Sequence, residues 1–249
     1  MAGTKERLDR RLQALRPDLS RNQIASFIMQ GLVTVDGRPV TKPGQLVSPD
    51  VPIVCTYTEP QYVGRAGFKL AGALDAFAID VTGTVCLDAG LSTGGFTDCL
   101  LQRGATKVFG VDVGYGQVHE KIRTDARVVV LERTNLRELK HLPGNQLVDL
   151  VTLDLSFISV LKVMPAVVNL MKPDARLVVL IKPQFEAERG DIGRGGIVRD
   201  PAVHERVVQT IRAGLATFGF SCVGVIESPI TGTDGNKEFL GYFVRNHPQ

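Results

Sequence analysis

Four charged residues stand where a chain of alternating strands and helices could gather them into one reactive site. Asp154 and Lys182 each end an apolar run, Lys69 lies on an expected helix, and Glu238 opens the last expected strand. Any one of them could mark only a solvent boundary, but open α/β sheets bind ligands at the carboxyl ends of their strands. A lysine acts as a base only if its pKa falls, through desolvation or a neighbouring cation. Lys69 and Lys182 would repel each other while the carboxylates hold their ammonium groups, so we predict that the four residues are catalytic.

A second group of residues has the pattern of a nucleoside-binding loop. An apolar strand over 84–88 runs into Gly90, Gly94 and Gly95. Asp112 ends the next expected strand, 22 residues after Gly90. Glycines let backbone N–H groups approach a ligand closely, and an acidic residue about 20 residues further on can hold ribose hydroxyls. The spacing therefore favours a nucleoside site over a plain glycine turn in an α/β core.

Three nucleotide-binding patterns compete for this loop. The glycine spacing departs from the dinucleotide pattern G-x-G-x-x-G, and Phe96 occupies the place of the lysine in a P-loop. The third pattern is a site for S-adenosylmethionine (SAM), which has no phosphate and needs neither feature. Asp88, at the end of the first strand, would then face the ammonium group of the ligand.

Composition places the chain among ordinary globular proteins. Its 249 residues are 44% hydrophobic and 22% charged, with a net charge of +3, which suits one medium domain with a small companion. The N-terminus has no apolar signal core, and no segment reaches the ~18 apolar residues of a membrane span. We therefore expect a cytoplasmic protein with no membrane contact. The cysteines form no C-x-x-C pair, so we expect reduced, buried thiols and no metal site; they are Cys55, Cys86, Cys99 and Cys222.

Periodicity divides the chain near residue 60. We predict a small domain over 1–59, a linker over 60–64 and a larger domain over 65–249. In the larger domain the predicted strands are 84–88, 107–112, 127–131, 148–154, 176–182, 221–227 and 239–245. The predicted helices are 66–78, 94–103, 117–124, 158–171 and 201–217. Alternation of this kind predicts an α/β fold with a largely parallel, Rossmann-like sheet. The last two strands are too close in sequence for a crossover helix, so they should form an antiparallel hairpin at one edge, as in the seven-stranded SAM-dependent methyltransferase sheet.

The first 59 residues predict two helices followed by short strands. One helix starts near Lys5, and Ser20 caps a second over 21–30, which Gly31 ends; Asp36-Gly37 forms a tight turn between strands. Basic residues gather on the helices, and from charge alone they fit a solvated face or an RNA-binding patch equally well. These residues are Lys5, Arg7, Arg10, Arg11, Arg16 and Arg21.

This module resembles the small RNA-binding domain named after ribosomal protein S-four. The resemblance rests on Arg7-Leu8-Asp9-Arg10-Arg11-Leu12 and on the run from Ser20 to Gly37, although Ala25 lies one place later than the family pattern has it. It covers most of residues 5–58. It implies an α/β domain that binds structured RNA, with its basic helix residues on phosphates.

The larger domain resembles the FtsJ-type ribose 2′-O-methyltransferases, whose Lys-Asp-Lys-Glu tetrad has the spacing of Lys69, Asp154, Lys182 and Glu238. Further motifs are similar to those of the TlyA family. These motifs are Tyr62–Leu70, Asp88–Asp98, Asp154–Ser159, Lys182–Glu186 and Gly235–Leu240. The order Gly64-Arg65-Ala66-Gly67 departs from that family but keeps Arg65. The resemblance implies 2′-O-methylation of cytidines in the ribosomal RNA of both subunits, with SAM as cofactor and ribosomal subunits as partners.

The motifs and the two resemblances together give the candidate site. Lys182 is expected to be the base or the main orienter of the 2′-hydroxyl, with Lys69 assisting. The residues expected to bind the cofactor are Asp88, Gly90, Ser92, Gly94, Gly95, Asp112, Val113, Asn135, Asp154 and Phe157. The residues expected to bind RNA are Lys5, Arg7, Arg10, Arg11, Arg21, Arg65 and Arg189. The glycine-rich segment 185–199 is either a mobile loop, whose Arg189, Arg194 and Arg199 could meet phosphate, or only a solvated loop.

Three other functions stay open at this point. Members of the family have been labelled haemolysins, but a membrane-active protein needs an amphipathic or spanning segment, and none is visible. A non-catalytic RNA-binding factor in ribosome assembly would keep the fold without the chemistry. A pseudouridine synthase could use the same RNA-binding module but would have no need of a SAM loop.

Overall fold

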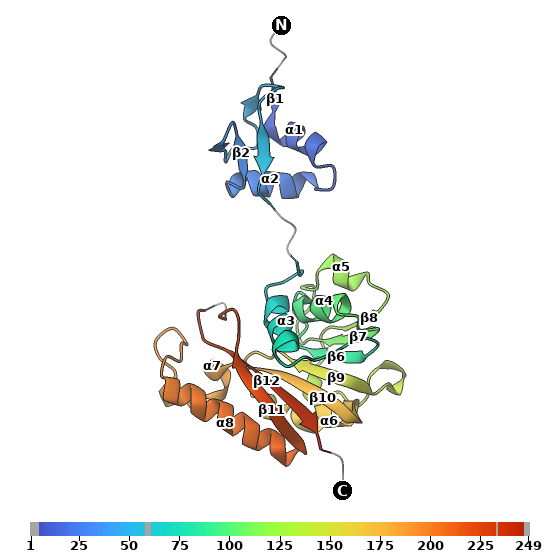
Figure 1. Ribbon diagram of the computed structural model, residues 1–249. Helices are drawn as coiled ribbons and strands as arrows, with labels where there is room; N and C mark the ends of the chain where they lie inside the picture. The colour runs from blue at the N-terminus through green and yellow to red at the C-terminus, as the bar shows by residue number, and fades with distance from the viewer. Residues whose placement is uncertain (1–4, 58–60, 233, 247–249) are drawn as a thin grey trace. The chain divides into compact units, whose positions relative to one another are not determined.

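The computed structural model describes residues 5–57, 61–232 and 234–246, which form two compact units, Met1–Pro60 and Gln61–Gln249 (Figure 1). Residue 60, the first of the predicted linker, lies outside the described residues, as do 58 and 59. Residues 61–64, also expected to be linker, belong to the second unit. No helix of the described residues is long and apolar enough to cross a bilayer.

The first unit packs two helices on short strands. Its helices are α1 (Leu8–Leu15) and α2 (Arg21–Met29), and its strands are β1 (Glu6–Arg7), β2 (Val33–Val35), β3 (Arg38–Pro39), β4 (Leu46–Val47) and β5 (Ile53–Cys55). The strands form an antiparallel sheet in the order β3-β2-β5 and a separate antiparallel pair of β1 with β4. The pair β1–β4 was not predicted, because two-residue strands have no periodicity to detect.

Local sequence explains the shape of the first unit. Ser20 forms a reciprocal capping box with Gln23 at the start of α2, as the sequence predicted. Asp36 and Gly37 both have positive φ, 52° and 72°, which is the backbone of the tight hairpin turn between β2 and β3. The core gathers the apolar faces of both helices against the strands, and its large, fully buried side chains are Leu8, Leu12, Ile24 and Ile28.

The second unit is built on a seven-stranded sheet in the order β11-β12-β10-β9-β6-β7-β8. Its strands are β6 (Val85–Ala89), β7 (Lys107–Val111), β8 (Val128–Leu131), β9 (Val148–Leu153), β10 (Met171–Ile181), β11 (Phe220–Glu227) and β12 (Phe239–Arg245). The five strands from β10 to β8 pair in parallel, whereas β12 is antiparallel to both β10 and β11. The predicted α/β class and the antiparallel hairpin at one edge are thus confirmed.

Helices cover both faces of this sheet (Figure 1). One apolar core contains residues of α3 (Ala66–Ala76) and α4 (Gly95–Gln102), and the other contains residues of α6 (Met164–Leu170) and α8 (Pro201–Thr217). The shorter elements are α5 (Glu120–Arg123), η1 (Leu136–Glu138), η2 (Pro143–Asn145), η3 (Val160–Lys162), α7 (Pro183–Glu186) and η4 (Arg189–Asp191). The two cores hold the sheet rigid between them, so the strand ends are fixed relative to one another.

The predicted helix over 158–171 is interrupted. The chain forms η3 first and then α6, in which a proline occupies the first turn. Because Pro165 has no N–H to give to a preceding carbonyl, it suits the start of a new helix better than the middle of a long one. β10 also begins earlier than predicted, at Met171, and its pairing with β9 shifts register between Met171 and Arg176.

Candidate active site

Strand register brings three of the four predicted catalytic residues to one edge of the sheet. Ile181 pairs with Phe239 across β10 and β12, so Lys182 and Glu238 are the next residues on facing chains. Asp154 directly follows β9, which lies on the other side of β10. The fourth residue, Lys69, reaches this edge from α3. Sequence-distant residues meet here because the parallel strands β9 and β10 end at this edge and the antiparallel strand β12 begins at it.

The four residues form two ion pairs. Lys69 Nζ lies 2.5 Å from Glu238 Oε2, and Lys182 Nζ lies 2.5 Å from Asp154 Oδ1. The residues are largely withdrawn from water, since Lys69, Lys182 and Glu238 are 8%, 9% and 3% exposed. Buried charges of this kind are stable only when each has a partner. Each lysine is therefore held in place by one carboxylate.

A cavity of about 560 Å³ opens beside the Lys182–Asp154 pair. Its volume is in the range of small-molecule and cofactor sites. Two of its wall residues, Asp154 and Ser156, also contact Lys182 Nζ, the serine through a 3.1 Å hydrogen bond that the lysine donates to Oγ. The predicted cofactor residues on its wall are Gly90, Ser92, Asp112, Val113, Asn135, Asp154 and Phe157.

Gly90 lets the loop after β6 reach the end of β9. Its φ is +92°, and a Cβ there would lie 2.1 Å from the carbonyl oxygen of Asp154. Gly94 and Gly95 have a different role, and neither is among the described residues that line the cavity. A Cβ on Gly95 would lie 2.9 Å from the backbone nitrogen of Gly67, so this glycine allows the start of α4 to pack against the start of α3.

Asp88 lies below the cavity rather than on it. The side chain is fully buried, and Thr97 Oγ1 and Thr152 Oγ1 donate to its two oxygens at 2.7 and 3.3 Å. Burial raises the pKa of Asp88 to about 7. Its carboxylate therefore joins β6 to α4 and β9, and the structure does not bring it to the wall where a ligand ammonium could meet it.

Two predicted cofactor residues on the wall also organise their own loops. Asp112 accepts hydrogen bonds from the backbone nitrogens of Ser92 and Gly114, both at 2.7 Å, and so joins the glycine loop to the end of β7. A carboxylate has about four lone-pair sites, which leaves capacity for a ligand. Asn135 caps η1, accepting from Arg137 N and donating to Glu138 Oε1.

Strained backbone marks the same cavity. Ser92 and Phe157 have φ of +48° and +65° although both carry side chains, and Phe157 is 91% exposed. Such conformations cost of order 1–3 kcal/mol each and gather at functional sites. Sequence patterns carry no signal for them.

Sequence reasoning missed one residue that joins the two catalytic loops. Glu186, on α7 after Lys182, accepts a 2.8 Å hydrogen bond from the backbone nitrogen of Val160, in the segment after Asp154. Burial raises the pKa of Glu186, opposed by its hydrogen bonds from Ser159 and Val160. The quoted motifs contained Glu186, but nothing in its spacing distinguished it from a solvated acid.

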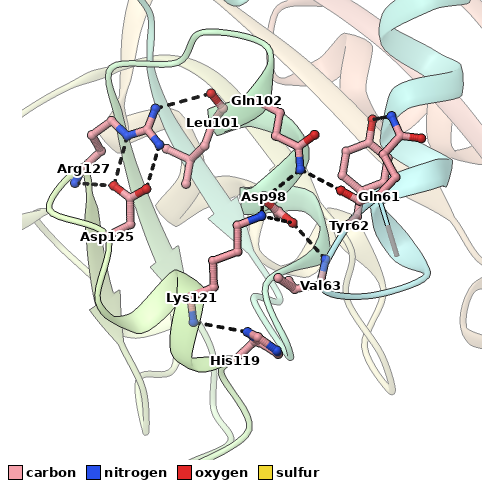
Figure 2. Close-up of polar contacts among 10 residues, drawn as sticks. All are labelled: Gln61, Tyr62, Val63, Asp98, Leu101, Gln102, His119, Lys121, Asp125 and Arg127. Atoms are coloured by element: carbon pink, nitrogen blue, oxygen red, sulfur yellow. Dashed lines mark hydrogen bonds and ion pairs between the residues drawn. The ribbon is translucent and has the colours of Figure 1, made fainter. Parts of the chain in front are cut away.

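The first residues of the second unit are fixed to α4, partly through Asp98, a carboxylate that α5 also contacts (Figure 2). Tyr62 is buried, and the backbone nitrogen of Val63 donates to Asp98 Oδ2 at 2.9 Å. Asp98 also pairs with Lys121 at 3.1 Å and accepts from Gln102. This is the physical reason that residues 61–64 behave as part of the folded unit.

The basic residues predicted to bind RNA lie on both units, five on the first and two on the second. Arg7, Arg10 and Arg21 line a cavity of about 420 Å³ on the first unit, although Arg7 is also paired with Asp9 at 2.6 Å. Lys5 is exposed nearby in the sequence. Arg11 instead pairs with Glu6 at 2.9 Å and donates to the carbonyl of Pro49, so its guanidinium supports the fold of the unit.

The second unit carries the other two predicted RNA-binding residues. Arg65 is exposed and donates to the carbonyl oxygen of Thr231 at 2.9 Å, in the loop before Glu238. Arg189 is exposed at the start of η4. Both therefore lie on segments that adjoin the catalytic edge in sequence.

Comparisons with known proteins agree with this architecture. The FtsJ-like methyltransferase model matches residues 62–245, and the S4 domain model matches residues 6–53. The 16S/23S rRNA (cytidine-2′-O)-methyltransferase TlyA of Mycobacterium tuberculosis is 49% identical over 222 residues, 89% of this chain and 83% of that protein. Hemolysin A of Brachyspira hyodysenteriae is 40% identical over 226 residues, 90% of this chain and 94% of that protein.

A solved structure supports the same assignment. A protein from Streptococcus thermophilus named as a hemolysin superimposes with a TM-score of 0.75 at 38% identity, covering 98% of this chain and 90% of that one. The chain therefore belongs to the FtsJ-like methyltransferase family, among the TlyA relatives, with an S4 domain ahead of the methyltransferase domain. The family resemblance predicted from the motifs is confirmed.

Proposed function

We propose that this chain transfers a methyl group from SAM to the ribose 2′-hydroxyl of cytidines in the ribosomal RNA of both subunits. The observation that carries the proposal is the meeting of the Lys182–Asp154 pair, one of two lysine–carboxylate pairs at this sheet edge, with a nucleoside-sized cavity. A cavity alone would fit many ligands, and ion pairs alone would fit a structural role. Their shared residue, Asp154, joins the chemistry to the binding site.

The cavity fits SAM better than a phosphate-bearing nucleotide. Asp112 on its wall has capacity for ribose hydroxyls, and apolar residues such as Val111 and Leu136 line it beside the loop. A pyrophosphate would need the N-terminus of α4, but that end is packed against the segment before α3. We infer that Gly90, Ser92, Val113, Asn135 and Phe157 complete the cofactor site, while Asp88, Gly94 and Gly95 shape it from beneath.

The catalytic roles follow from which pair reaches the cavity. SAM, when bound, supplies an electrophilic methyl group. Lys182 is the lysine whose partners line the cavity, so its Nζ is the group placed to orient the 2′-hydroxyl and take its proton. Lys69 and Glu238 are not among the described residues of the wall. We assign Lys69 and Glu238 to hold the acceptor ribose and to balance the charges at this sheet edge, so that the 2′-hydroxyl is aligned with the methyl group of SAM.

The substrate assignment rests on the first unit and on the relatives. An S4 domain with Arg7, Arg10 and Arg21 around one cavity suits the phosphates of folded RNA. The Mycobacterium tuberculosis relative is named for cytidine 2′-O-methylation of 16S and 23S rRNA, and we extend that substrate to this chain. Lys5, Arg65 and Arg189 are proposed as further RNA contacts, and the cytoplasm, where ribosomes assemble, as the compartment.

Lys182→Ala tests this function. We expect methyl transfer to rRNA to fall by roughly 10²- to 10⁴-fold, while SAM and RNA affinities stay within about threefold of wild type. Lys172→Ala is the matched control, because Lys172 lies near the start of β10, the strand that Lys182 follows, and likewise pairs with a carboxylate, Asp149, at 2.6 Å. Full transfer by Lys182→Ala would refute the assignment. Unmodified rRNA with the wild-type protein would favour the non-catalytic RNA-binding role instead.

A further inference from the structure

The glycine-rich segment after α7 contains a small closed hairpin. Gly193 N donates to the carbonyl oxygen of Ile197 at 3.0 Å, and Gly196 N donates to that of Gly193 at 3.1 Å. Gly195 and Gly196 have φ of +80° and +74°, a left-handed turn that favours glycine. We call residues 193–198 the arginine hairpin, because Arg194 lies exposed in its turn.

A buried asparagine clamps this hairpin. Asn236 is 1% exposed, and its carboxamide uses both ends: Oδ1 accepts from Val198 N and Nδ2 donates to the carbonyl oxygen of Gly196, both at 3.0 Å. His204 Nε2 lies 3.0 Å from the carbonyl oxygen of Val198. A carbonyl can only accept, so this nitrogen carries the proton. The backbone of Val198 is thus held at its N–H by Asn236 and at its C=O by His204 of α8.

The same asparagine belongs to the turn that leads into Glu238. Its backbone carbonyl accepts from Gly232 N at 2.9 Å, and a Cβ on Gly232 would lie 2.6 Å from Glu238 Oε1. The turn therefore borders the catalytic carboxylate on one side and grips the arginine hairpin on the other. The hairpin has a fixed place relative to the catalytic edge, although its glycine content suggested a mobile loop.

We propose that Asn236 is a positioning residue that holds the arginine hairpin so that Arg194 contacts a phosphate of the RNA substrate beside the reacting ribose. The proposal rests on the proposed function, since it takes RNA as the substrate. Arg194 forms no ion pair with any described residue, and its planar fork of N–H donors matches phosphate oxygens. Fixing the hairpin in advance reduces the ordering cost when RNA binds.

A double-mutant cycle between Asn236 and Arg194 tests the coupling. Arg194→Ala should raise the KM for rRNA about tenfold, leave kcat within about threefold, and lower the slope of log affinity against log salt by about 1. Asn236→Ala should do the same. In the double variant the two costs should not multiply, because a released hairpin no longer presents the arginine. Independent, multiplying effects would overturn the proposal, as would a fall in kcat at unchanged KM.

Limited trypsin digestion of the full chain measures the clamp itself. Cleavage after Arg194 should be several-fold faster in Asn236→Ala than in wild type. Asn236→Asp keeps an acceptor for Val198 N but replaces the donor to Gly196 with an oxygen of a buried carboxyl group, and it should show the same direction if the alanine variant folds poorly. Asn169→Ala is the control, since this exposed asparagine only donates to the carbonyl of Pro165 within α6. Unchanged cleavage in both Asn236 variants would overturn the clamp.

The two experiments separate this inference from the proposed function. If the wild-type chain transfers no methyl group, the proposed function fails, while digestion and direct rRNA binding still decide whether Asn236 positions the hairpin. If methyl transfer occurs and rRNA affinity is insensitive to both residues, the proposed function stands and the positioning role is refuted.

Discussion

Replacement of Asp88 by asparagine should stabilise the protein, and increasingly so as the pH rises. Asp88 is fully buried between β6, α4 and β9, and burial raises its pKa to about 7. An unfolded chain would ionise the same carboxyl near pH 3.9. Asparagine has the same shape, carries no charge at any pH, and can still bond with the hydroxyls of Thr97 and Thr152.

The sign follows from which state holds the proton. Below about pH 4 the carboxyl is neutral in both states, and the group costs nothing. Between about pH 4 and 7 the folded state keeps a proton that the unfolded state releases, so the free energy of unfolding falls as the pH rises. Above about pH 7 the loss is complete. A pKa of about 7 against about 3.9 corresponds to on the order of 4 kcal/mol in all, and on the order of 3 kcal/mol between pH 5 and 8.

Urea denaturation of wild type and Asp88→Asn at pH 5, 6, 7 and 8, without ligand, measures the difference. Asp75→Asn on α3 is the control: a hydrogen bond from Arg103 lowers the pKa of Asp75, so its effect should be constant over this range. The gap between Asp88→Asn and wild type should widen from pH 5 to 7 and then level off. A gap that stays constant, or narrows, would refute a raised pKa at Asp88.

Two further predictions concern single backbone features. Gly90→Ala should cost about 3 kcal/mol and weaken SAM binding, because a Cβ would meet the carbonyl of Asp154 at a φ of +92°; Gly83→Ala, at +74° in open space, should cost about 1 kcal/mol by the same urea titration, and equal costs would contradict the close approach. Ser20→Ala removes the capping box with Gln23, so hydrogen exchange of the α2 amides should report a loss of about 1 kcal/mol, with kcat at saturating RNA unchanged; unaltered exchange would show that the cap contributes nothing.

Periodicity predicted the strands of the second unit and its edge hairpin because each strand is a long apolar run between turns. The same reasoning failed where an element is too short to have a period, as in β1 and β4. It also missed the break at Pro165, where one helix becomes two. Apolar spacing continues across that break, so only the missing N–H of the proline indicates it.

The candidate site was predictable in its residues but not in its connections. Lys69 and Glu238 are far apart in sequence, and their direct pairing follows from α3 lying over the end of β12, which no local pattern encodes. Asn236 was within a quoted motif, yet its grip on Val198 depends on how two loops approach in space. Backbone strain at Ser92 and Phe157 is equally invisible in sequence, since both residue types are common in relaxed conformations.

The three glycines of the predicted binding loop have different places in the structure. Only Gly90 of its three glycines lines the cavity, and it does so by touching the backbone of Asp154. Gly94 and Gly95 instead have no side chain where α4 packs closely against its neighbours, and Asp88 bonds to the start of α4 and to β9.

An asparagine at position 88 would make the protein more stable at neutral pH, so the acidic residue is better explained by the effect of its charge on the adjacent cavity. Coulomb repulsion from Asp154 is one cause of the raised pKa of Asp88, after burial. A positively charged ligand in the cavity would oppose this repulsion and favour ionisation of Asp88. Proton release on SAM binding near pH 6, measured by calorimetry in buffers of different ionisation enthalpy, should accordingly be larger in wild type than in Asp88→Asn.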